Sequence, residues 1–218
     1  FERWRACGAL HVLLPALSAT PAWAFAACDH VARPDDATRA ERAELRYLVR
    51  LALPLLPFDR HTATQALRAL RCSNHEITVV AGIVDTWRQH GAALASAARG
   101  PIAGATSRRL AAALGRTRAA AMLRACDAAW RAMRAAGMDA PDEVAARRLS
   151  HRVLRSAWRE PIALADLAVG GDDLRAAGVP AGPQLGATLQ RLLAAVLEEP
   201  ARNTREVLLA LAMTPPGS

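Results

Sequence analysis

The sequence predicts an all-α fold, with a helical body followed by a small helical tail module. Alanine, leucine and arginine dominate the composition, and these residues have the highest helix propensities, whereas aromatic residues make up only 4% of the chain. Apolar residues also recur at spacings of three and four, as on one face of a helix. With 218 residues, 52% of them hydrophobic, the chain can bury one good core or two small ones.

The first segment, residues 1–30, shares features with a secretory signal peptide. Arginines near the N-terminus precede an apolar run from Ala6 to Ala24. An acidic residue at position 2 and the interruptions at His11 and Pro15 argue against a signal peptide, and the chain begins at Phe1 rather than Met. We expect this segment to be the end of a helix that starts upstream. No run reaches the roughly 18 apolar residues of a membrane span.

Three helix starts follow in the body, residues 31–160. Asp36 is expected to cap a helix that runs to about Pro54, and Thr62 to cap a short one. The strongest signal is a capping box, in which the Ser73 hydroxyl and the Glu76 carboxylate satisfy each other's backbone N–H groups. We expect the helical pattern that begins there to be broken at Gly91, then at Gly100-Pro101 and at Gly104.

The rest of the body predicts a helical stretch over about 106–136, interrupted near Gly115, and a linker over 138–141. A further helix is expected from about Pro141, which suits the first helical turn, to Arg159. Beyond Pro161 the chain becomes rich in glycine and proline, with helices expected over 184–197 and 204–212. We therefore place the boundary between body and tail near residue 161.

Charge is concentrated in one stretch of about sixty residues. All 28 basic residues are arginines, a usage that GC-rich coding would produce, so their distribution is more informative than their number. Residues 1–98 carry 11 arginines and 9 acids, 99–159 carry 13 and 4, and 160–218 carry 4 and 7. The excess in the middle stretch predicts a surface for a polyanion, and a solvated helical face is the alternative.

Helical geometry arranges part of this charge as a stripe. Arg148, Arg152, Arg155 and Arg159 fall within an arc of about 60° on one helix, at 100° per residue. The core face of the same helix is predicted to hold Ala146, Leu149, Val153 and Ala157. The stripe could follow a phosphate backbone, with Arg124, Arg131 and Arg134 extending it from the preceding helix.

Three motifs follow one another in the tail. Residues 164–174 read L-x-D-L-x-x-x-G-x-D-L, residues 178–186 read G-V-x-x-G-P-x-L-G, and residues 192–200 read L-L-x-x-V-L-x-x-P. Together they resemble the tail of bacterial CCA-adding tRNA nucleotidyltransferases and the related poly(A) polymerases. Looser resemblances to the same family lie at 1–17, which contains L-L-P-x-L, at 70–76 and at 108–115.

The resemblance implies an enzyme that adds C, C and A to tRNA 3′ ends from CTP and ATP with Mg²⁺, or adds A alone. It implies a catalytic head N-terminal to this chain, and a body and tail that hold the acceptor and T arms of tRNA. The family's Asp-x-Asp metal pair does not occur in these residues, so we expect neither catalytic residues nor a bound cofactor here. A helical protein-interaction module that binds no RNA is the alternative from a different class.

The turn at 178–186 is a second candidate contact with RNA. Gly182, Pro183 and Gly186 surround the start of a helix, where uncovered N–H groups can bind phosphate. A tight turn that lets two helices pack closely explains the same glycines.

Other reactive or aromatic residues are interpreted as structural. Asp172 or Asp173 is expected to cap a helix ahead of Leu174 rather than to catalyse. The four cysteines have no metal-ligand spacing and are expected to be reduced core thiols of a cytoplasmic protein. Trp87 and Trp158 are expected in the core. Only a tryptophan that is exposed could stack on a base.

Overall fold

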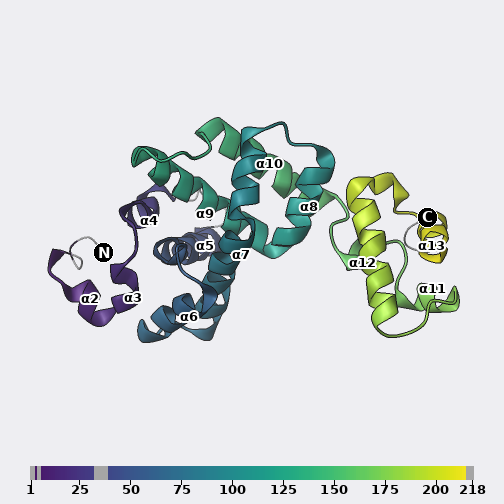
Figure 1. Ribbon diagram of the computed structural model, residues 1–218, viewed down its shortest axis with the longest axis horizontal. Coiled ribbons are helices and arrows are strands. Elements are labelled where there is room, and N and C mark those ends of the chain that lie inside the picture. The colour runs from purple at the N-terminus through teal and green to yellow at the C-terminus, as the bar shows by residue number, and fades with distance from the viewer. Residues whose placement is uncertain (1–2, 4–5, 32–38, 215–218) are drawn as a thin grey trace. The chain divides into compact units, whose positions relative to one another are not determined.

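The computed structural model describes residues 3, 6–31 and 39–214, and all regular structure in these ranges is helical (Figure 1). This confirms the predicted all-α class. The chain divides into two compact units, Phe1–Pro101 with Ala120–Ser150 and Ile102–Ala119 with His151–Ser218. The expected boundary at residue 161 lies inside the second unit. No helix in the described ranges is long and apolar enough to cross a membrane.

The first unit begins with short helices, α2 (Ala9–Leu13), α3 (Pro15–Ser18) and α4 (Ala22–Ala26), followed by the 3₁₀ turn η1 (Ala27–His30). Proline explains two of the breaks, because it lacks the N–H that a continuing helix would use. Pro15 is the first residue of α3, and Pro21 is the N-cap of α4.

Three helices follow, α5 (Arg39–Ala52), α6 (Arg60–Ala69) and α7 (Asn74–Arg99), with the 3₁₀ turn η2 (Leu53–Leu55) after α5. Helix α7 packs against both α5 and α6, as Figure 1 shows. The expected cap at Asp36 lies outside the described residues. Thr62 does not cap α6, because the cap is Asp59, whose Oδ1 accepts a hydrogen bond from the Thr62 N–H at 2.7 Å.

The predicted capping box at the start of α7 is confirmed. The Ser73 N–H donates to Glu76 Oε2 at 2.6 Å, and the Glu76 N–H donates to Ser73 Oγ at 3.3 Å. The expected break at Gly91 is wrong, since α7 continues to Arg99, whereas the expected break at Gly100 is confirmed as the C-cap of this helix. A Cβ at Gly91 would lie 3.3 Å from the Trp87 ring, so glycine here leaves room for an indole one turn earlier.

Helices α8 (Gly104–Leu114) and α9 (Arg116–Ala135) are separated at Gly115, as the sequence predicts. Helix α10 (Glu143–Arg159) ends where expected but begins two residues after Pro141. The reason is Asp142, whose Oδ1 accepts a hydrogen bond from the Ala145 N–H at 2.7 Å and so caps the helix.

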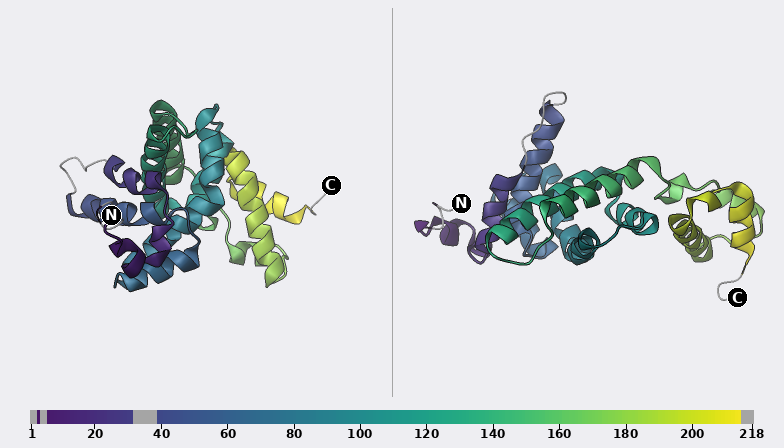
Figure 2. Two further views of the ribbon diagram at one scale, coloured as in Figure 1. Left: turned by 60° about the vertical axis from the view of Figure 1, so that its left-hand side comes forward. Right: turned by 90° about the horizontal axis from the view of Figure 1, so that it is seen from above.

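The second unit ends in α11 (Gly171–Ala176), α12 (Pro183–Glu198) and α13 (Arg205–Met213), with 3₁₀ turns η3 (Leu164–Asp166) and η4 (Pro200–Arg202). Figure 2 shows α13 beside α12, and these helices share a small core. That core consists of Val169, Leu174, Val179, Leu192, Val196 and Leu208. The expected acidic N-cap is wrong, because the N-cap of α11 is Gly170 and both acids lie in the first turn of the helix. There Asp173 accepts a hydrogen bond from the Gly170 N–H at 2.8 Å.

Candidate RNA-binding surface

Helix α10 separates an apolar face from a basic one. The residues predicted for its core face are all buried, namely Ala146, Leu149, Val153 and Ala157. The four predicted stripe arginines are all exposed. The periodicity of the sequence therefore identified both faces of this helix correctly.

Arg148 belongs to the first unit and has a structural contact there. Its guanidinium donates to the carbonyl of Ala98 at 3.1 Å, in the last turn of α7. A cation at this place complements the negative end of the helix.

Two of the three arginines on α9 that were expected to extend the stripe also make contacts inside the first unit. Arg131 pairs with Asp127 at 3.0 Å and with Glu143 at 3.1 Å, and Arg134 donates to the Pro141 carbonyl. Arg124 is exposed on the same helix. The contacts of Arg131 and Arg134 hold α9 against the start of α10 and leave these guanidinium groups less available to RNA.

Arg108, another arginine of the basic stretch, stabilises the second unit. Arg108 is only 9% exposed, and its guanidinium donates to the carbonyls of Leu197 and Glu198 at 2.6 and 2.8 Å. It also pairs with Glu160 at 2.9 Å, and this carboxylate accepts a hydrogen bond from Ser156 at 3.0 Å. Arg108 thus links the C-terminal ends of α12 and α10.

Arg152, Arg155 and Arg159 differ from these structural arginines. In the part of the chain that the structure describes, no hydrogen bond or ion pair engages their side chains. All three lie in the second unit, on the solvent-facing side of α10. They are therefore available to an external anion.

Trp158 lies beside these arginines and is 65% exposed, so its expected place in the core is wrong. At 100° per residue it falls about 100° beyond the buried Ala157, toward solvent. With His151, Leu154, Arg155 and Arg159 it lines a shallow pocket of about 510 Å³. The sequence already indicated this grouping, because residues 151, 155 and 158 are spaced four and three apart and so lie on one side of a helix.

The glycine turn before α12 is exposed at Gly182, Pro183 and Gly186. Gly182 has a φ of 104°, so the turn itself requires glycine at this position. The N–H groups of Leu185 and Gly186 both approach the Gly182 carbonyl, at 3.1 and 3.4 Å. These contacts account for the turn without a ligand, and its role in phosphate binding stays a prediction.

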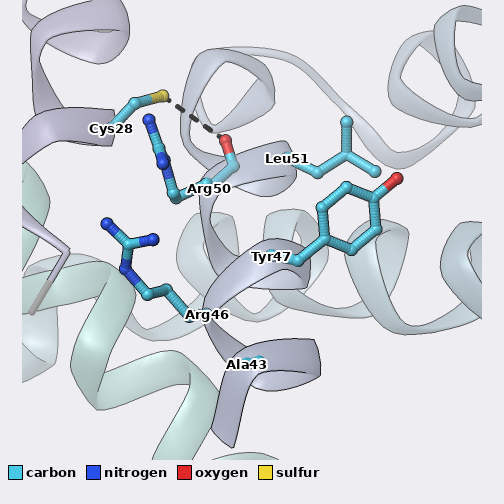
Figure 3. A pocket seen from close by; sticks show the side chains of 6 residues that line it. All are labelled: Cys28, Ala43, Arg46, Tyr47, Arg50 and Leu51. Carbon is cyan, nitrogen blue, oxygen red and sulfur yellow. Dashed lines mark hydrogen bonds between the residues drawn. The ribbon is translucent and has the colours of Figure 1, made fainter. Parts of the chain in front are cut away.

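A second pocket, in the first unit, is lined by Cys28, Ala43, Arg46, Tyr47, Arg50 and Leu51 (Figure 3). Its polar groups serve internal contacts. The Arg46 Nε donates to the Val31 carbonyl at 3.2 Å, the Tyr47 hydroxyl donates to Glu76 at 2.8 Å, and the Cys28 thiol donates to the Arg50 carbonyl at 3.4 Å. Burial raises the pKa of Cys28 to about 11, which Arg50 only partly opposes, so this residue stays a thiol at neutral pH.

Among the described residues, the other cysteines and the acids form no metal site. Cys126 is buried as predicted, but Cys72 is only half-buried and Cys7 is exposed, so the expectation of core thiols is wrong for these two. Within the described ranges no group of three or more His, Cys, Asp and Glu side chains could hold a metal ion. These residues therefore do not fit the Mg²⁺ that the family resemblance implies.

Residues 147–212 match the family model for tRNA nucleotidyltransferase domain 2. The matched residues include Arg152, Arg155 and Arg159, together with Trp158 and the turn at 182–186. They do not include the arginines of α9. Comparisons with curated proteins and with solved structures found no match. The C-terminal part of this chain, with the exposed basic face of α10, is thus similar to a domain of tRNA nucleotidyltransferases.

Proposed function

We propose that this chain is the tRNA-binding part of a nucleotidyltransferase that adds CCA to tRNA 3′ ends. The observation that carries the proposal is the exposed group Arg152, Arg155 and Arg159, which has no internal partner among the described residues and lies in the matched region. Guanidinium groups bind phosphate oxygens bidentately, so such a row suits an RNA backbone. The acceptor and T arms of tRNA are the proposed ligands.

In this proposal the transfer chemistry lies outside these residues. CTP, ATP and Mg²⁺ would be held by a catalytic head of the same enzyme. The described residues offer no metal site, and the sequence contains no Asp-x-Asp pair. The role of this chain is then to position the RNA. It would recognise mainly the backbone and shape of the RNA rather than the RNA sequence.

The test is the affinity of the chain for a tRNA transcript, measured at several salt concentrations. Replacing Arg152, Arg155 and Arg159 together with Gln is expected to weaken binding and to flatten the salt dependence by about two to three units, since each lost phosphate contact removes somewhat under one. The matched control replaces Arg175, Arg202 and Arg205 with Gln. This variant loses the same charge, but these three arginines are paired with acidic side chains. Equal effects of the two triple variants, or none, would refute the proposal.

A further inference from the structure

Trp158 has an unusual position for a tryptophan, because 65% of its surface is exposed. In the sequence of the second unit it is the single Phe, Trp or Tyr residue. Its pocket neighbours are a histidine, a leucine and two arginines, all on the same stretch of α10. Building on the RNA-binding function above, we propose that Trp158 stacks on an unpaired nucleobase. Arg155 and Arg159 bind the phosphates next to that base.

The helix positions support this division of roles. Around α10, Trp158 lies about 20° from His151 and about 40° from Leu154, which give the stacking surface an aromatic and an apolar border. Arg155 lies about 60° away on the opposite side from Leu154, and Arg159 about 100° away on that same side. A nucleotide needs a flat surface for its base and a cation for its phosphate, and α10 offers both in adjacent rows.

The stacked base must be unpaired, because bases inside an A-form duplex are covered by their neighbours. Proteins read RNA bases mainly in loops, bulges and ends, where a splayed base can stack on an aromatic side chain. The arginines alone would bind paired and unpaired RNA alike. Trp158 therefore adds a preference for RNA in which a duplex adjoins exposed nucleotides.

The surrounding charge favours RNA over a protein partner. Residues 147–159 contain five arginines and no acid. A protein interface over Trp158 would also cover Arg155 and Arg159, and burying these cations without anionic partners is costly. A polyanion satisfies the cations and the aromatic ring together.

The experiment compares two RNA probes, a blunt duplex and the same duplex with a short single-stranded 3′ extension. Trp158→Ala is expected to weaken binding of the extended RNA at least about five-fold, the lower end of measured base–aromatic stacking. It should leave the affinity for the blunt duplex and the salt dependence unchanged, since stacking releases no counterions. Trp158→Phe should retain most of the affinity. Val144→Ala, at a 73% exposed apolar position of the same helix, should change nothing.

Two outcomes overturn the stacking proposal. One is an equal loss of affinity for both RNAs, or no loss for either, in a Trp158→Ala protein that melts like the parent. The other is a change in oligomeric state without a change in RNA binding, which would assign Trp158 to a protein contact. If the triple arginine variant still loses affinity for both RNAs, only the stacking proposal fails. If it binds both RNAs like the parent, the proposed function fails as well.

Discussion

Arg116 and Asp166 form a bidentate ion pair, with Nη1–Oδ1 at 3.0 Å and Nη2–Oδ2 at 2.7 Å. The same carboxylate accepts hydrogen bonds from the N–H groups of Ile162 and Ala163, at 2.9 and 2.8 Å. Arg116 also donates to the carbonyl of Ala157 at 2.7 Å, near the end of α10. This pair therefore fixes the turn that follows the candidate RNA-binding helix.

Replacing Asp166 with Asn is expected to destabilise the protein by about 1–3 kcal/mol at neutral pH. The substitution removes a charged acceptor of hydrogen bonds, and such bonds contribute about 1.5–3 kcal/mol each when charged groups take part. The carboxylate is only 20% exposed, so solvent screens the pair incompletely. Chemical denaturation of the parent and the variant measures the difference.

The same pair predicts a dependence on pH. Burial alone would raise the pKa of Asp166, but the hydrogen bonds from Arg116, Ile162 and Ala163 outweigh it and hold the pKa below its usual value. Because the folded pKa lies below the unfolded one, this stabilisation is complete above about pH 5 and is lost as the pH falls through the folded pKa. The stability gap between parent and Asp166→Asn should therefore narrow below about pH 4. A gap that is constant down to pH 2 would contradict this reasoning.

Arg108→Ala is expected to cost about 3–5 kcal/mol, because it leaves the carboxylate of Glu160 without its cation and two carbonyls without their donor. Arg108→Lys should restore little, since an ammonium group cannot reproduce the planar fork. Thermal or denaturant unfolding measures both variants.

Arg109 supplies the control for Arg108, one residue further along α8. It pairs with Glu198 at 3.1 Å, but its side chain is 59% exposed. Exposed pairs contribute about 0–1 kcal/mol, so Arg109→Ala should unfold nearly like the parent. Similar losses for the two variants would mean that Arg108 acts through surface charge rather than through its buried contacts.

The helix starts and faces of this protein were largely predictable because they depend on neighbours in the sequence. The capping box at Ser73 and the two faces of α10 are local features, and both were predicted. The break expected at Gly91 was wrong. The rule that glycine interrupts a helix takes no account of the Trp87 ring, which occupies the space beside this glycine. The roles of Arg108 and Arg116 depend on partners 41 or more residues away, which no local pattern reveals.

We expect these 218 residues alone to transfer no nucleotide to RNA. Two-metal phosphoryl transfer needs carboxylates that converge on the cations, and the sequence contains no Asp-x-Asp pair. Incubation of the purified chain with tRNA, Mg²⁺ and labelled CTP or ATP tests this. Incorporation of label that persists in independent preparations would show that the chain holds a catalytic site of another kind.

Single substitutions should separate arginines that bind RNA from arginines that stabilise the fold. Arg152→Gln, Arg155→Gln and Arg159→Gln should each reduce the salt slope of tRNA binding by somewhat under one unit, with stability changed by less than about 0.5 kcal/mol. Arg148→Gln should instead cost about 0.5–1.5 kcal/mol of stability, because it loses the hydrogen bond to Ala98, and should leave the salt slope unchanged. The four positions share one helical stripe and lose the same charge, so a purely electrostatic surface predicts equal slopes for all four. A stripe that contacts no RNA predicts no change in slope for any of them.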